Sequence, residues 1–171
     1  MNKIVLISGI LFGLADLFAI ASLALPDWIL TGAAGNMRLG LTLQCLTIHN
    51  RDEICVSPKL SIEWTTTFVL IIIGILCLTA NVMCLMLSHW EDVLKKYAKW
   101  LAFFAMISFC TAGIVFPMGF YVDEIGGYPF QLPTQSQVGV SYVLFILSIF
   151  FTIISELLAE QICRPLPGAV F

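Results

Sequence analysis

The sequence predicts an all-α transmembrane four-helix bundle that carries a small extracellular antiparallel β-sheet in its first outer loop. Three observations predict this fold class. The 171 residues are 60% hydrophobic and 11% charged, with a mean hydropathy of +0.98, whereas a soluble domain is closer to half apolar and a quarter charged. Four apolar stretches are each long enough to cross a bilayer, which requires about 20 residues. A polar segment with the alternating pattern of a strand lies between the first two stretches.

The four apolar stretches define one membrane domain over residues 1–171, with expected spans at 4–25, 65–87, 101–121 and 138–158. Tryptophan favours the boundary between lipid and water, because its indole ring is apolar with one polar atom. All four tryptophans fall at expected span ends: Trp28, Trp64, Trp90 and Trp100. A cleaved signal peptide is the alternative for the first stretch, but its apolar run is longer than is usual for such a peptide.

The distribution of lysine and arginine predicts the orientation of the spans. The short connection 88–100 contains Lys95, Lys96 and Lys99, and the loop 122–137 contains no basic residue. Basic residues concentrate on the cytoplasmic side of a membrane. We therefore expect a multi-pass plasma-membrane protein with both termini and the 88–100 loop in the cytosol, and with the loops 26–63 and 122–137 outside.

Two cysteines of the first outer loop, Cys45 and Cys55, are expected to form a disulfide, because an exported loop passes through an oxidising compartment. A zinc site with His49 and Asp52 as further ligands is an alternative, and free thiols are another. Structural zinc sites normally use a closely spaced C-x₂₋₄-C pair, which this loop lacks. We therefore expect neither a metal nor a cofactor.

The residues around these cysteines predict two antiparallel strands. Residues 38–45 alternate between polar or small and apolar side chains, and residues 54–56 are apolar and partly β-branched. Directly opposed residues in such a pair lie close enough for a disulfide. Pairing Cys45 with Cys55 places Ile48 opposite Asp52.

One acidic residue, Asp16, lies within the first span, where a carboxylate costs about 2.5–3.5 kcal/mol on insertion scales. Gly9 and Gly13 form a GxxxG motif on the same helical face, and such motifs allow close helix packing. We expect this face to pack against another helix with Asp16 buried at the contact. The expected hydrogen-bond partners are Asn81, Ser108 and Thr111. Two interpretations remain open, a protonated packing residue and a proton or cation relay.

A stripe of small and polar residues in the fourth span predicts a helix-packing face. Its members are Ser141, Ser148, Thr152, Ser155 and Ala159. Their spacing places them on one side of a helix, and small side chains of this kind are typical of helix contacts in membranes.

Three aromatic residues of the outer loops are candidate contacts with a partner protein: Trp28, Tyr128 and Phe130. Exposed aromatic side chains are frequent binding hot spots. The alternative for Tyr128 and Phe130 is that they pack against the sheet or rest on the lipid headgroups.

The composition excludes several classes of function. The chain has two histidines and no cluster of His, Cys and acidic residues, so an enzyme is not expected. It has no clustered basic face, so nucleic acid is not expected as a partner. Cys163, just after the fourth span, is either a free thiol or a palmitoylation site.

The first outer loop resembles the W…GLW…C…C signature of the claudin superfamily. The matching residues are Trp28, Gly40-Leu41, Cys45 and Cys55, while Thr42 stands where claudins have a second tryptophan. The resemblance implies the four-span fold with an outer sheet. Its functional implication is cell–cell adhesion or a paracellular barrier.

A resemblance over nearly the whole chain is to the modulator of smoothened family. It rests on LFAIAS (17–22), PDWI (26–29), QCLTIHNRDEIC (44–55), SHW (88–90), FPMGFYVDEIGGYPFQLP (116–133) and SYVLFILSIFFTI (141–153). The resemblance implies a non-enzymatic adaptor that negatively regulates Hedgehog signalling. Its implied partners are a large single-pass receptor-like protein and a RING ubiquitin ligase, which lower Smoothened at the cell surface and in the cilium.

Overall fold

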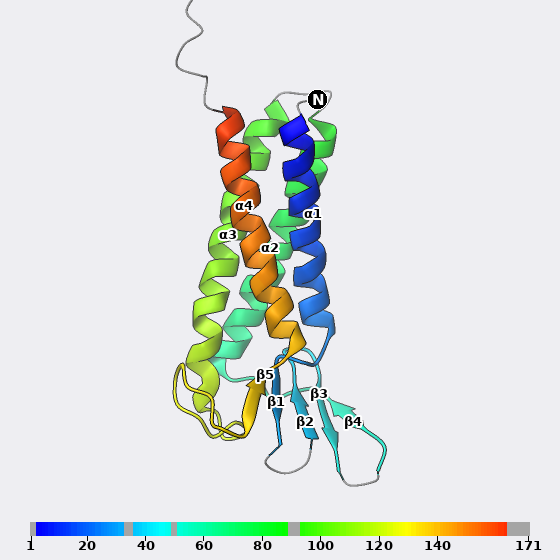
Figure 1. The fold of residues 1–171 in the computed structure, drawn as a ribbon, viewed down its shortest axis with the longest axis vertical. Coiled ribbons are helices and arrows are strands. Elements are labelled where there is room, and N and C mark those ends of the chain that lie inside the picture. The colour runs from blue at the N-terminus through cyan, green and yellow to red at the C-terminus, as the bar shows by residue number, and fades with distance from the viewer. Residues whose placement is uncertain (1–2, 33–35, 49–50, 89–92, 164–171) are drawn as a thin grey trace, which may run out of the picture.

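Four long helices run side by side, and a β-sheet closes one end of the bundle (Figure 1). The computed structural model describes residues 3–32, 36–48, 51–88 and 93–163. The helices are α1 (Lys3–Ala24), α2 (Ile62–Leu87), α3 (Val93–Met118) and α4 (Val140–Cys163). Each is long and apolar enough to cross a membrane. The predicted architecture of four spans and a sheet is confirmed.

The third helix begins at Val93 rather than near residue 101. Its first turns carry Lys95, Lys96 and Lys99, which are good helix formers. Lysine side chains can extend along a helix and place their ammonium groups in water. The helix therefore begins before the apolar segment from which the start of the third span was predicted.

The sheet contains five antiparallel strands in the order β4-β3-β2-β1-β5. The strands are β1 (Ile29–Thr31), β2 (Asn36–Leu39), β3 (Gln44–Thr47), β4 (Ile54–Val56) and β5 (Ser136–Val138). The first four come from the segment between α1 and α2, where the sheet was predicted but only two strands were expected. The fifth comes from the segment between α3 and α4, where no strand was expected because only three residues pair.

The expected single strand over residues 38–45 is wrong, because the chain turns inside it. Gly40 donates its backbone N–H to the carbonyl of Leu43 at 2.9 Å and separates β2 from β3. A Cβ atom on Gly40 would lie 2.6 Å from Pro26 Cα and 2.8 Å from the Leu43 carbonyl oxygen. The alternation of polar and apolar residues continues through the turn, so in this segment of the sequence only Gly40 indicates that the strand is interrupted.

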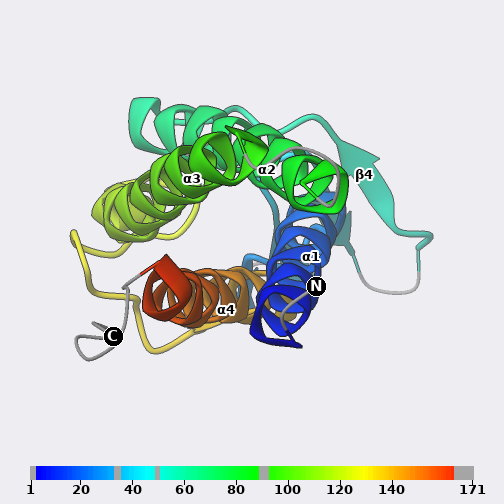
Figure 2. The ribbon, with the colours of Figure 1, turned by 90° about the horizontal axis from the view of Figure 1, so that it is seen from above.

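The four helices pack as two pairs, α1 with α4 and α2 with α3 (Figure 2). The α1–α4 contact uses the predicted stripe of α4, whose members Ser141, Ser148, Thr152 and Ser155 are fully buried. Ser148 Oγ donates to the Ala15 carbonyl at 2.8 Å, and Ser8 Oγ donates to the Ser155 carbonyl at 3.1 Å. The packing role predicted for this stripe is confirmed. In the other pair, the ring of Phe109 lies directly against Gly74.

Trp28 lies in the core at the junction of helices and sheet, with 1% of its surface exposed. Its indole Nε1 donates to the Ser22 carbonyl at 2.7 Å. Its ring centroid is 4.7 Å from that of Phe116 and 5.4 Å from that of Phe145. Trp28 follows the end of α1, as expected, but aromatic side chains of α3 and α4 enclose it, so its indole offers almost no surface to lipid headgroups.

The other tryptophans divide between core and surface. Trp64 is also buried, and stacks on Phe116 with centroids 5.5 Å apart. Trp100 is 55% exposed, as expected of a side chain at the lipid–water boundary. Trp90 lies outside the described residues.

Substitution of Trp28 by alanine is expected to destabilise the protein by about 3–5 kcal/mol, because it removes a fully buried indole and leaves a cavity. The matched control is Trp100→Ala, which removes an exposed indole and is expected to cost far less. Thermal unfolding of both variants in the same detergent measures the difference. Equal losses would contradict the central position assigned to Trp28.

Candidate functional site

The sheet end of the molecule is hydrogen-bonded to the start of α4 at Asp27, the residue before Trp28. The Asp27 carbonyl accepts the N–H of Ser141 at 3.0 Å, and the Asp27 N–H donates to Ser141 Oγ at 3.1 Å. Gly139 lies so close to the Asp27 carbonyl that an added Cβ would overlap it. The end of α1 and the start of α4 therefore form one rigid junction.

An ion-pair network crosses the sheet from this junction. Arg38 of β2 binds both carboxylate oxygens of Asp27, with Nη2 at 2.7 Å from Oδ2. Its Nη1 also donates to Glu53 Oε1 at 3.2 Å. Asp27, followed by Glu53, raises the pKa of Arg38 further above its ordinary value. These partners of Arg38 could not be predicted from the sequence, because they depend on how β2 lies relative to the end of α1 and the start of β4.

Cys45 and Cys55 form a disulfide. They oppose each other in the β3–β4 pairing, with Cα atoms 4.1 Å apart, which is the predicted register. The Glu53 carboxylate lies near both sulfur atoms, but bonded sulfurs provide no thiolate for zinc. Of the residues in the zinc alternative, Asp52 is exposed and His49 lies outside the described residues.

The disulfide holds β4, which is an edge strand of the sheet. Ile54 and Val56 are 60% and 53% exposed on this strand. With Gln44, Leu46, Ile48, Arg51 and Asp52 they line a hollow of about 210 Å³. An edge strand with apolar side chains can pair with a strand of another chain. This surface could not be predicted from the sequence, since the position of β4 at the edge follows from the order of the strands in the sheet.

Tyr128 and Phe130 lie on a tight turn between α3 and β5. The backbones of Tyr128 and Gln131 exchange two hydrogen bonds, of 3.2 and 2.9 Å, and Phe130 N–H donates to the Pro117 carbonyl at 2.9 Å. Tyr128 is 73% exposed and Phe130 is 59% exposed. Both side chains project from the protein, whereas Trp28 has almost no accessible surface. Of the three candidate contact residues, Trp28 therefore cannot touch a partner directly.

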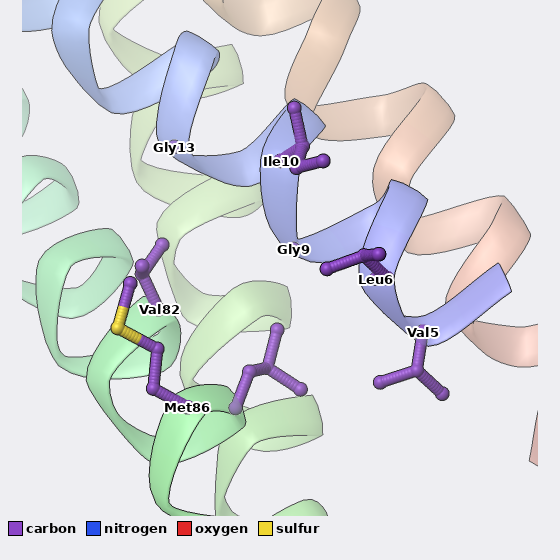
Figure 3. Close-up of a pocket in the computed structure, with 8 residues that line it drawn as sticks. Val5, Leu6, Gly9, Ile10, Gly13, Val82 and Met86 are labelled. Carbon is purple, nitrogen blue, oxygen red and sulfur yellow. The ribbon is translucent and has the colours of Figure 1, made fainter. Parts of the chain in front are cut away.

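The glycine face of α1 lines an open groove between α1 and α2, so the expected close packing of Gly9 and Gly13 is wrong. A Cβ on Gly13 would have no atom within 4 Å, and one on Gly9 would have only Leu85 at 3.9 Å. The groove has a volume of about 570 Å³, and its residues come from facing sides of the two helices (Figure 3). The reason is that α1 also has small residues on its opposite face, and that face packs on α4.

Asp16 lies beside a continuation of this groove, in a hollow of about 410 Å³. Its Oδ2 accepts a hydrogen bond from Thr79 Oγ1 at 2.7 Å, and its Oδ1 has no hydrogen-bond partner among the described residues. Thr79 was not among the expected partners, Asn81, Ser108 and Thr111. Asp16 is half-buried at the flank of the bundle rather than enclosed inside it.

Loss of the disulfide in Cys45→Ser or Cys55→Ser is expected to destabilise the protein by about 2–3 kcal/mol, by the chain entropy of a short closed loop. The control is Cys84→Ser, which replaces a free cysteine. Thermal unfolding measures the effect, and mass spectrometry after alkylation without reduction counts the free thiols. A wild-type protein that alkylates at Cys45 and Cys55 would contradict the pairing.

Substitution of Asp16 by leucine is expected to favour membrane insertion of α1 by about 2.5–3.5 kcal/mol, because it removes a carboxylate from the span. Insertion assays in microsomes measure this effect. A lower folded yield for Asp16→Leu would show that Asp16 is needed for packing.

Substitution of Thr79 by valine leaves the Asp16 carboxylate without its hydrogen-bond donor, and is expected to destabilise the protein by about 1–3 kcal/mol. Thermal unfolding measures this effect.

A sequence model of the protein family described as Attenuator of Hedgehog matches residues 25–165 of this chain. The matched range begins just after α1 and includes the sheet, the disulfide, the turn that carries Tyr128 and Phe130 (the aromatic turn), and helices α2, α3 and α4. The glycine face of α1 and Asp16 precede it. Because the match covers well over half of the sequence, the chain belongs to the Attenuator of Hedgehog family.

Proposed function

We propose that this protein is a non-enzymatic membrane adaptor that attenuates Hedgehog signalling by lowering Smoothened at the cell surface and in the cilium. The observation that carries the proposal is the family match over residues 25–165. The proposed partners are a single-pass receptor-like membrane protein and a RING ubiquitin ligase, as the resemblance in the sequence implies. No catalytic chemistry is required of the chain itself, because the ligase would modify the target.

The proposed orientation places the sheet outside the plasma membrane and both termini in the cytosol. Lys95, Lys96 and Lys99 lie at the end of the bundle opposite the sheet, and basic residues favour the cytoplasmic side. The disulfide supports the same orientation, since the sheet would then fold in an oxidising compartment. Most of the described residues lie in the spans and in the sheet, so the contacts with partners are expected there. We therefore expect the ligase to be recruited through the receptor-like partner.

The aromatic turn is the proposed contact with the receptor-like partner. Phe130 has a φ angle of +61°, a left-handed conformation that costs a residue with a Cβ about 1–2 kcal/mol. The hydrogen bond to Pro117 holds it there. Strained backbone conformations concentrate at functional sites. An exposed aromatic residue held in such a conformation supports a binding role for Tyr128 and Phe130.

Adhesion between cells is the second candidate function, because the sheet has an open apolar edge at β4. Exposed Ile54 and Val56 would meet a strand of another molecule there. This function resembles that of claudins, and predicts localisation at cell contacts.

The test is deletion of the gene in Hedgehog-responsive cells, with Smoothened quantified at the surface and in the cilium. We expect Smoothened to rise and to return to normal when the wild type is expressed. The double variant Tyr128→Ser with Phe130→Asn is expected to lower Smoothened at least severalfold less than the wild type does. Asparagine tolerates the left-handed conformation, so this variant should unfold at or above the wild-type temperature.

The matched control is Ile54→Ser with Val56→Thr, which removes apolar surface from the β4 edge instead of the turn. This control is expected to restore Smoothened regulation fully. If Smoothened does not change on deletion, the adaptor function is wrong. Loss of cell contacts with the β4 variant would then support adhesion.

A further inference from the structure

A small cavity of about 70 Å³ lies among the four helices at the end opposite the sheet, and a few polar side chains reach its otherwise apolar wall. Its lining includes residues from each helix: Val5, Ser8 and Phe12 of α1; Asn81 and Leu85 of α2; Lys95, Ala98, Lys99 and Ala102 of α3; and Glu156 and Ala159 of α4. Three of the side chains from α3 and α4 are alanines, whose small size leaves the space open.

Two buried polar side chains point to a polar ligand in this cavity. Asn81 is 1% exposed, and neither its Nδ2 nor its Oδ1 has a hydrogen-bond partner among the described residues. Glu156 is 6% exposed, and its Oε2 is likewise unpartnered there. Buried polar groups in folded proteins are nearly always hydrogen-bonded. The inner wall therefore offers both acceptors and donors to a bound group.

The charges of the cavity are ordered from its interior to its mouth. The acidic residue Glu156 is inside, whereas Lys95 and Lys99 are exposed residues and mark the mouth. Lys99 Nζ lies 3.7 Å from Glu160 Oε1, so this lysine already interacts with one surface acid. A ligand that matches this order has a cationic donor at its tip and an anionic group behind it.

The open groove between α1 and α2 adjoins the cavity. Val5 and Leu85 line both. The other groove residues are apolar or glycine, and Leu6, Ile10 and Met86 are about half exposed or more on the flank of the bundle (Figure 3). In a membrane this flank faces the acyl chains. A volume of about 570 Å³ is within the range of ligand sites.

We propose that the cavity and the groove together bind one phospholipid with a primary ammonium head, phosphatidylethanolamine. The ammonium group donates to Glu156 and to Asn81 Oδ1, the phosphate lies toward Lys95 and Lys99, and an acyl chain occupies the groove. A cavity of about 70 Å³ holds a few water-sized groups at roughly 15 Å³ each. An ethylammonium group fits this space, and an inositol ring does not. A quaternary ammonium has no N–H to donate.

The first experiment identifies the lipid retained by the full-length protein. The wild type is purified from cells in mild detergent, and the bound lipid is measured by native mass spectrometry and lipid extraction. We expect about one phosphatidylethanolamine per chain, and at least a tenfold preference over phosphatidylcholine. Retention of phosphatidylserine in its place would overturn the choice of phosphatidylethanolamine, because the serine carboxylate would lie beside Glu156. Equal retention of phosphatidylcholine would overturn the proposal.

The second experiment uses variants of the two parts of the site. Glu156→Gln is expected to reduce the preference for the primary ammonium at least tenfold, and Gly9→Leu to reduce retention of every phospholipid by filling the groove. The matched control is Glu160→Gln, which makes the same charge change one turn along α4 and is expected to retain the lipid. Unchanged selectivity in Glu156→Gln would overturn the assignment of the head group.

A third measurement does not depend on how well the variants fold. Wild-type protein in nanodiscs of phosphatidylcholine alone is compared with protein in nanodiscs that also contain phosphatidylethanolamine. A ligand that binds only the folded state raises the unfolding temperature, so a higher temperature is expected with phosphatidylethanolamine. An equal unfolding temperature in both would overturn the proposal. None of these outcomes depends on Hedgehog signalling, so the adaptor function can fail independently.

Discussion

The burial of Trp28 is the constraint on which the rest of the structure depends. Its indole stands between the sheet and the helices, where it contacts aromatic rings from α3 and α4 and donates to the end of α1. Its backbone N–H donates to the Leu39 carbonyl at 2.9 Å, and its carbonyl accepts from Gly139. A residue shortly after the first span is thereby fixed to three helices, to β2 and to the short link between β5 and α4. The position of β1, and hence of the whole sheet, follows from it.

The sheet end combines rigid anchoring with exposed apolar and aromatic side chains on β4 and on the turn between α3 and β5. Arg38 and the disulfide hold β2, β3 and β4 without a large core of their own. The aromatic turn is anchored separately, through the carbonyl of Pro117 at the end of α3. The exposed groups on β4 and on the turn are therefore presented by a fixed frame. Such preorganised surfaces lose little conformational entropy on binding.

The sequence predicted those features that depend on local pattern or on the solvent. The four spans follow from hydropathy, the Cys45–Cys55 pairing from compartment and spacing, and the packing stripe of α4 from helical periodicity. Features that depend on the path of the chain could not be predicted in this way. The choice of α4 over α2 as the partner of α1 is the clearest case, because α1 has small residues on two faces. The GxxxG motif alone could not decide which face would be buried.

The same limit applies to the polar residues of the spans. Asp16 was identified as costly in lipid, but its partner Thr79 depends on how α1 and α2 are offset along their axes. Asn81 was considered only as a partner for Asp16, and Glu156 stands far along the sequence, near the end of the expected fourth span. The structure places these two residues on one cavity. Their spacing of 75 positions in the sequence carries no signal of this.

The position of β5 beside β1 determines the order in which the protein can be completed during synthesis. Ile29 pairs with Val138, so the strand that leaves α1 waits for a partner made roughly 5–20 seconds later at about 5–20 residues per second. The pocket for Trp28 also requires Phe116 and Phe145. A nascent chain with three spans therefore exposes an indole and an open strand edge. Both are covered only late in synthesis, the edge by β5 and the indole by α4.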